Sequence, residues 1–167
     1  MNISLKKTEI VACILSCILG VLFHFVYNWS NQSFFLGFFV PVNESIWEHL
    51  KLHFYPIILV SIPQYYLLGK QYPDFFCVKF RSILLAIFST VILFYTYSGI
   101  LGQIVDFINI AIFFLSMILA YLYSCKQLQK QAPAKSSGYC ILGLFTLALL
   151  FAVFTIYPPA IGLFQVP

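Results

Sequence analysis

Five long apolar segments, separated by short polar stretches, dominate the pattern of this 167-residue chain. A helix needs about 20 apolar residues to cross a bilayer, and each segment has roughly that length. The pattern therefore predicts an all-α membrane protein, a bundle of about five transmembrane helices that forms one integral membrane domain over residues 1–167. The predicted spans are residues 8–27, 45–68, 78–101, 104–124 and 139–157.

A shorter apolar run, Phe34–Val40, lies between the first two predicted spans. Seven residues are too few to cross a membrane. Gly37 within the run and Pro41 directly after it favour a bend in the chain. We expect a short re-entrant or interfacial segment here, and we expect it to line a pocket at the outer surface.

The composition supports a membrane protein, since 62% of the residues are hydrophobic and only 8% are charged. The 19 Phe and 11 Tyr residues include many near predicted span ends, as the aromatic belts at membrane interfaces require. The net charge of +4 is not arranged as a basic stripe with interleaved aromatic residues, so nucleic-acid binding is excluded as a function. The bilayer itself is the expected partner.

Basic residues mark one side of the predicted bundle. Eight of the nine Lys and Arg residues lie on that side, and the predicted outer loops hold none. Cytoplasmic loops are enriched in such residues, so we expect a multi-pass protein with a cytoplasmic N-terminus, a polar cytoplasmic loop at 127–138 and an external C-terminus. The first span is interpreted as a retained signal anchor. The eight are Lys6, Lys7, Lys70, Lys79, Arg81, Lys126, Lys130 and Lys135.

The five cysteines show no spacing typical of a metal or redox motif. Free cysteine behaves as a small buried hydrophobic residue. We therefore interpret Cys13, Cys17, Cys77, Cys125 and Cys140 as packing residues.

The stretch Pro41–His53 carries two of the five acidic residues and two of the three histidines, directly where the second span begins. Ionisable groups are costly in hydrocarbon, so such a cluster is a candidate functional site. Helical spacing places Glu44, Glu48 and Lys51 along one edge and His49 and His53 along another. The opposite side, expected to meet lipid, carries Ile46, Trp47, Leu50 and Phe54.

Several chemistries fit this cluster. Glu48, His49 and His53 are candidate catalytic residues for acid–base reactions. His49 and His53, at i and i+4, are candidate ligands of a divalent metal ion, with His24 as a further candidate. The candidate ligand-binding residues at similar depth are Glu44, Trp47, Lys51, Tyr95, Tyr97 and Asp106.

Helix capping is the simpler interpretation of part of the cluster. Ser45 and Glu48 fit a capping box, and Asn43 and Glu44 suit a helix N-terminus. Capping explains the two acids, but it leaves His49 and His53 without a role.

Three functions remain open. The preferred one is an outer-leaflet Glu/His pocket that binds a small cation or a lipid-like ligand. The first alternative is a membrane-embedded enzyme, metal-assisted or acid–base, that acts on a lipidic substrate. The second is a non-catalytic subunit, a homo-oligomer or the partner of another membrane protein, whose polar face is satisfied by a neighbouring helix.

The motif Asn43-Glu44-Ser45-x-Trp47-Glu48-His49-x-Lys51 resembles the signature of a family of small bacterial polytopic membrane proteins, catalogued as a domain of unknown function. The resemblance extends over nearly the whole chain, including Phe94–Gly99 and Tyr157–Pro159. It implies the family's membrane fold and a bacterial plasma membrane. It implies no activity, substrate or cofactor.

Overall fold

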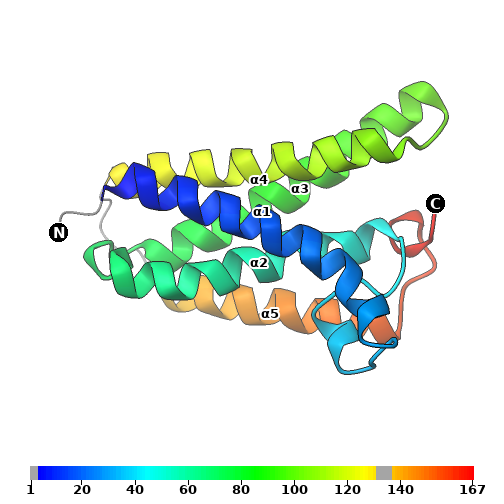
Figure 1. Cartoon of the computed structure of the whole chain (residues 1–167), viewed down its shortest axis with the longest axis horizontal. Helices are drawn as coiled ribbons and strands as arrows, with labels where there is room; N and C mark the ends of the chain where they lie inside the picture. The colour runs from blue at the N-terminus through cyan, green and yellow to red at the C-terminus, as the bar shows by residue number, and fades with distance from the viewer. Residues whose placement is uncertain (1–3, 131–136) are drawn as a thin grey trace.

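The computed structural model describes residues 4–130 and 137–167, and these residues form five α-helices (Figure 1). Three short 3₁₀ turns, η1 to η3, complete the described structure. The predicted all-α class is therefore confirmed, and each helix begins and ends within five residues of the predicted span. The helices are α1 Leu5–Trp29, α2 Ile46–Leu67, α3 Phe75–Leu101, α4 Asp106–Gln129 and α5 Ser137–Ile156, and the turns are η1 Leu36–Phe38, η2 Gly69–Gln71 and η3 Gly162–Phe164.

Four of the helices are long and apolar enough to cross a membrane: α1, α3, α4 and the Gly138–Ile156 part of α5. The protein is therefore a multi-pass membrane protein by the length and composition of its helices. Helix α2 has 22 residues but carries the polar cluster in its first half. It lies alongside the other helices, within the bundle (Figure 1).

Successive helices run in opposite directions, so the connections gather at two ends (Figure 1). The end that holds the start of α1, the α2–α3 connection and the end of α4 is called the basic end here. The end that holds residues 30–45, the α3–α4 connection and the C-terminus is called the histidine end. All described Lys and Arg residues except Lys51 belong to the basic half of their helices or to its connections. Lys135 lies outside the described residues.

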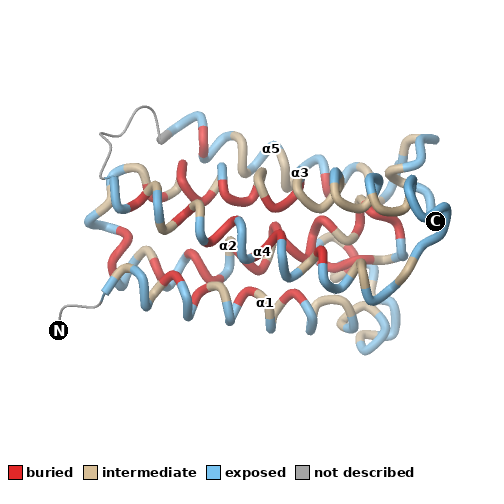
Figure 2. The backbone as a smooth tube through the Cα atoms, turned by 90° about the horizontal axis from the view of Figure 1, so that it is seen from above, coloured by how far each residue is buried: buried red, intermediate tan, exposed pale blue. Residues whose placement is uncertain are grey.

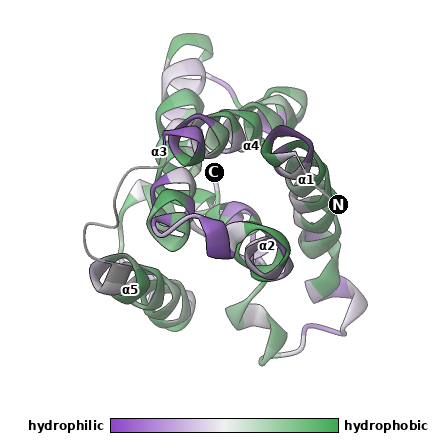
Figure 3. Cartoon of the chain, turned by 90° about the vertical axis from the view of Figure 1, so that its left-hand side faces the viewer, coloured by the Kyte–Doolittle hydropathy of each residue, from purple (hydrophilic) through white to green (hydrophobic). Residues whose placement is uncertain are grey.

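Helix α2 is the centre of the bundle, since it contacts α1, α3 and α5 while α4 closes the far side against α1 and α3. Figure 3 shows the five helices end-on, with apolar residues (green) on their outward faces. Figure 2 shows the buried positions in the middle of the bundle. The expectation that Ile46, Leu50 and Phe54 meet lipid is wrong. Leu50 and Phe54 are only 1% exposed because α3 and α5 cover this face.

The segment at residues 34–40 does not cross the membrane. It folds into η1 and returns to α2, as the sequence predicted for a short segment between the first two helices. The Lys51 ammonium donates hydrogen bonds to the carbonyls of Gly37 (2.8 Å) and Val40 (3.4 Å). A lysine within α2 therefore holds this segment against the bundle.

Lys51 also forms a buried ion pair with Glu48 at 2.6 Å. The Glu48 carboxylate accepts further hydrogen bonds from the Thr155 hydroxyl (2.9 Å) and the Val42 N–H (3.0 Å). The expected N-cap is also present, since the Ser45 hydroxyl accepts from the Glu48 N–H at 3.4 Å. Glu48 and Lys51 thus join α2, α5 and the preceding connection into one unit.

A second buried ion pair, which the sequence did not predict, lies at the basic end. The Lys79 ammonium contacts both carboxylate oxygens of Glu9, at 2.8 and 3.0 Å, and Gln64 donates to the same carboxylate at 2.5 Å. All three side chains are 2% exposed. Lys79 lies in the second turn of α3, which begins at Phe75. Three helices are joined here by one carboxylate.

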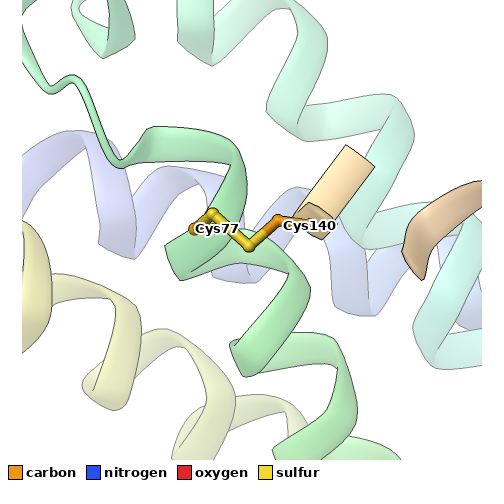
Figure 4. Close-up of a disulfide and its surroundings, with 2 residues drawn as sticks. All are labelled: Cys77 and Cys140. Atoms are coloured by element: carbon orange, nitrogen blue, oxygen red, sulfur yellow. A yellow bond between two sulfur atoms is a disulfide. The ribbon is translucent and has the colours of Figure 1, made fainter. Parts of the chain in front are cut away.

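Two of the five cysteines form a disulfide, Cys77 on α3 with Cys140 on α5 (Figure 4). The interpretation of these two as packing residues is therefore wrong. The pair is 63 residues apart in sequence, so its contact depends on the docking of α5 against α3. Cys13, Cys17 and Cys125 are free. The bond is buried, which shields it from soluble reductants.

We expect three thiols to react with maleimide when the purified protein is denatured without reductant, and five after reduction. Intact-protein mass spectrometry gives both counts directly. The Cys77→Ser variant is the control, and it should show four reactive thiols under either condition. Five reactive thiols in the unreduced wild-type protein would contradict the disulfide.

Candidate functional site

A cavity of about 680 Å³ lies at the histidine end, between α1, α2 and α4. Its walls are mainly apolar, and its polar groups come from all three helices and from the residue two positions before α2. Such a combination of apolar walls and a few converging polar groups is typical of ligand sites. The lining residues are Gly20, Val21, His24, Phe25, Glu44, His49, Leu52, Asp106, Asn109, Ile110, Phe113 and Phe114.

Gly20 sets how closely the helices around this cavity approach. A Cβ atom at this position would lie 2.6 Å from the Phe113 ring and 3.0 Å from the Leu52 carbonyl oxygen. A carbon–carbon contact of 2.6 Å is too short to occur, so α1 packs this closely against Phe113 of α4 because residue 20 is glycine. The cavity lies beyond this contact, toward the histidine end.

His49 is held in one tautomer by its position in the first turn of α2. Its Nδ1 lies 3.0 Å from the Ser45 carbonyl oxygen, which can only accept a hydrogen bond. Nδ1 therefore carries the hydrogen, and Nε2 is left as the second ring nitrogen. Metal-binding histidines are commonly oriented in this way by a backbone carbonyl. His49 Nε2 faces the Glu44 carboxylate at 3.3 Å.

Glu44 stands outside the helices, on the connection that leads into α2, and its side chain is 67% exposed. The hydrogen bond from His49 lowers the pKa of this carboxyl group below its ordinary value. The group is therefore a carboxylate throughout the neutral and mildly acidic range. When His49 is neutral, two electron-pair donors face one another across 3.3 Å, and only a proton or a cation between them makes that contact favourable.

His24 completes the arrangement from α1. Its ring lies against that of His49, with a centroid separation of 5.3 Å. Its Nδ1 is buried and has no hydrogen-bond partner among the described residues. One ligand atom each from His24, Glu44 and His49 lies within 4.8 Å of the others. We call these three residues the His–Glu cluster.

The spacing of the His–Glu cluster suits a metal ion. Zinc binds histidine nitrogen and carboxylate oxygen at about 2.0–2.2 Å, so two ligands of a tetrahedral ion lie roughly 3.4 Å apart. Glu44 and His49 already have this separation. The third ligand atom, from His24, lies within 4.8 Å of the other two. Three protein ligands would leave one position of a tetrahedral ion open.

The opposite wall of the cavity is formed by the first turn of α4, where Asp106 and Asn109 point to the same space. Tyr97 fixes this wall, because its hydroxyl donates to the Asn109 side-chain oxygen at 2.5 Å and accepts from the Val105 N–H at 3.3 Å. Asp106, predicted as a ligand-binding residue, lines the cavity but does not belong to the His–Glu cluster. Tyr97, predicted likewise, is not among the lining residues and contacts the cavity wall only through Asn109.

His53 does not join His49, as their spacing had suggested it would. It is one helical turn deeper, 1% exposed, with Nε2 at 2.8 Å from the Thr90 hydroxyl and its ring stacked on Phe113. Thr90 in turn donates to Ser116 at 3.0 Å. Histidines at i and i+4 share a helix edge, but here His53 contacts α3 and His49 contacts α1. The pair that the fold brings together is His24 and His49.

The remaining predicted site residues lie away from the cavity. Glu48 and Lys51 are engaged with α5, and Trp47 packs against aromatic rings of α5 and η3. Tyr95 is 44% exposed on α3. Phe34–Val40 does not line the cavity either, because Lys51 holds that segment on the other side of α2.

Asn109 and Gly20 are among the lining residues that were not found from the sequence. Asn109 appears as an ordinary polar residue within an apolar span, and Gly20 as one of eight glycines. A polar residue one helical turn after Asp106 was an available signal for Asn109, since the two share a helix face. No comparable signal marks Gly20, because its role depends on Phe113 of a distant helix.

Comparison with known proteins gives a family and no activity. A family model described as a family of unknown function, DUF6512, matches residues 1–166. The expectation of an uncharacterised family is thereby confirmed. No curated protein and no solved structure matches the chain.

Proposed function

The chain belongs to the family of unknown function DUF6512, and we propose that it is a membrane protein that binds a divalent metal ion through His24, Glu44 and His49. The observation that carries this proposal is the convergence of the three ligand atoms within 4.8 Å. Two imidazoles and one carboxylate are ligands that zinc commonly takes, and other transition metals accept the same set.

The cavity beside the His–Glu cluster supports a second ligand. Its volume of about 680 Å³ and its phenylalanine and isoleucine walls suit an apolar chain or ring. Asp106 and Asn109 line the same cavity from α4. An amphipathic molecule could thus place its polar group at the open coordination position and its apolar part along α4. The lipid-like ligand expected from the sequence fits this arrangement.

A metal-assisted reaction is the second candidate function. Two histidines, one glutamate and an open position form the ligand pattern of hydrolytic zinc sites, in which a bound water becomes a nucleophile near neutral pH. Asp106 is the carboxylate on the cavity wall that is available as a proton acceptor. An acid–base reaction that uses Glu48 with His53 has less support, since the two residues are engaged with Lys51 and Thr90.

The proposed binding is tested by its dependence on pH. Glu44 keeps its charge in mild acid because its pKa is lowered, whereas an ordinary histidine has a pKa near 6.5. Protons therefore compete with the metal at the two imidazoles. We expect the Zn²⁺ affinity, measured by isothermal titration calorimetry, to fall on the order of 50-fold between pH 7 and 5.5.

The Glu44→Gln variant is the control for this titration. It should bind zinc more weakly at every pH and should still lose affinity as the pH falls, since both histidines remain. An affinity of the wild-type protein that does not change over this range would contradict binding through imidazole.

The orientation in the membrane is also a proposal. The basic end lies in the cytoplasm of a bacterium, and the His–Glu cluster opens at the outer face of the plasma membrane. The distribution of Lys and Arg supports this, and the N- and C-termini lie at opposite ends of the bundle (Figure 1). The alternative function, a non-catalytic subunit that binds a second copy of the chain or another membrane protein, stays a prediction.

Labelling of single introduced cysteines in intact cells, with the free Cys13, Cys17 and Cys125 replaced by serine, tests the orientation. We expect a membrane-impermeant maleimide to label Gln32→Cys at the histidine end and to leave Gln71→Cys at the basic end unlabelled. Both side chains are exposed in the fold, so exposure to reagent is decided by the membrane alone. Permeabilised cells, in which both sites should react, are the control. Labelling of Gln71→Cys in intact cells would reverse the proposed orientation.

A further inference from the structure

A second cavity lies on the other half of the boundary between α1 and α4. It has a volume of about 490 Å³ and belongs to the basic end. α1 and α4 run side by side in opposite directions (Figure 1). The Ser16 hydroxyl and the Tyr121 hydroxyl, 2.6 Å apart, join the two helices at the closed end of this cavity. It is therefore separate from the cavity at the histidine end.

The lining of this cavity repeats on both helices. Residues spaced four apart lie on one helix face, about 6 Å apart along the axis. On each helix the outermost of three such positions is a lysine and the next two are aliphatic. Because the helices are antiparallel, the lysines face one another and the aliphatic residues follow at matching depth. The two rows are Lys6, Ile10 and Ile14 on α1, and Lys126, Leu122 and Ile118 on α4.

These side chains have no protein partner that accounts for them. The aliphatic ones are between 46% and 60% exposed. Lys6 and Lys126 form no ion pair within residues 4–130 and 137–167. The one acid of the lining, Glu9, is 2% exposed and already paired with Lys79. The mouth of the cavity therefore carries two positive charges that no acid of its lining balances.

We propose that this groove binds an anionic phospholipid of the surrounding membrane. The phosphate lies between Lys6 and Lys126 at the headgroup level, and one acyl chain lies between the aliphatic rows. Lysines near a membrane surface attract anionic lipids, and each contributes about a fivefold gain in affinity. The Glu9–Lys79 pair removes the negative charge that would otherwise repel the phosphate. This site is independent of the proposed metal site.

Native mass spectrometry of the full chain, incubated in detergent with phosphatidylglycerol or phosphatidylcholine, tests the proposal. The wild-type protein should retain phosphatidylglycerol preferentially. The Lys6→Gln/Lys126→Gln variant should lose affinity for it on the order of 25-fold, with its affinity for phosphatidylcholine unchanged.

A matched variant separates a built site from general surface charge. Lys70→Gln/Lys130→Gln removes the same number of charges at the same end, at exposed positions outside the groove. It should retain phosphatidylglycerol as the wild-type protein does. Equal losses in both double variants, no loss in either, or equal retention of the two lipids by the wild-type protein would each overturn the proposal.

Discussion

Replacing His49 by alanine is expected to weaken Zn²⁺ binding on the order of 100-fold or more. Loss of a residue that merely orients a ligand costs 10- to 100-fold in metal affinity, so loss of the ligand itself should cost at least as much. His49 supplies Nε2, which its hydrogen bond to the Ser45 carbonyl aims at Glu44. Isothermal titration calorimetry of the purified variant measures the effect, and His24→Ala should behave in the same way.

His53→Gln is the matched control, since His53 is the remaining histidine of the chain. Glutamine can keep a hydrogen bond to Thr90, so the protein should fold and bind zinc with the wild-type affinity. If His53→Gln loses zinc and His24→Ala retains it, the ion is held by the pair that the sequence suggested. The proposed binding of the metal by the His–Glu cluster would then be contradicted.

Replacing Lys51 by methionine is expected to destabilise the protein by about 3–5 kcal/mol. Removing one partner of a buried ion pair leaves the other as an uncompensated charge, and this is the usual cost. Glu48 is 2% exposed and would keep only the hydrogen bonds from Thr155 and Val42. The hold on Gly37 would also be lost. Reversible denaturation in detergent micelles measures the change in unfolding free energy.

Two further variants show whether the charge is the cause. Lys70→Met removes an exposed lysine and should change the unfolding free energy by roughly 0.5 kcal/mol or less. Adding Glu48→Gln to Lys51→Met removes the unpaired carboxylate and should recover part of the stability. A Lys51→Met protein as stable as Lys70→Met would show that the ion pair contributes nothing.

The helices could be predicted closely because a span is a local property. A run of about 20 apolar residues can be recognised as a span from its own sequence, without reference to the rest of the chain. The same holds for the cap at Ser45 and for the short segment around Gly37, which the local pattern placed between two helices. The packing of one helix against another is not a local property. Leu50 and Phe54 were assigned to lipid because nothing in α2 itself shows that α3 and α5 cover them.

The sequence indicated where polar side chains gather, but it did not indicate which of them come together. A dense group of ionisable residues at the start of a span marks where polar side chains must find partners. Glu44 and His49 are in the cluster that the structure brings together. The choice of His24 over His53 depends on how α1 and α3 meet α2. Glu48 and Lys51 share the same motif and serve to attach α5.

The other features that the sequence did not predict are long-range contacts. The Glu9–Lys79 pair joins residues 70 positions apart, and the Cys77–Cys140 bond joins residues 63 apart. Each partner alone looks ordinary: an acid near the start of a span, a lysine near a loop, two isolated cysteines. Their roles appear only when three or four helices are placed together.

X-ray absorption spectroscopy at the zinc edge of the zinc-loaded protein tests the central claim most directly. Histidine nitrogen and carboxylate oxygen scatter from about 2.0–2.2 Å, whereas cysteine sulfur scatters from about 2.3 Å. We expect one zinc ion per chain with two imidazoles and only light-atom ligands, and a signature of one imidazole in His24→Ala. A sulfur shell, which would place the ion at the free cysteines Cys13, Cys17 or Cys125, or an unchanged spectrum in His24→Ala, would contradict the proposed site.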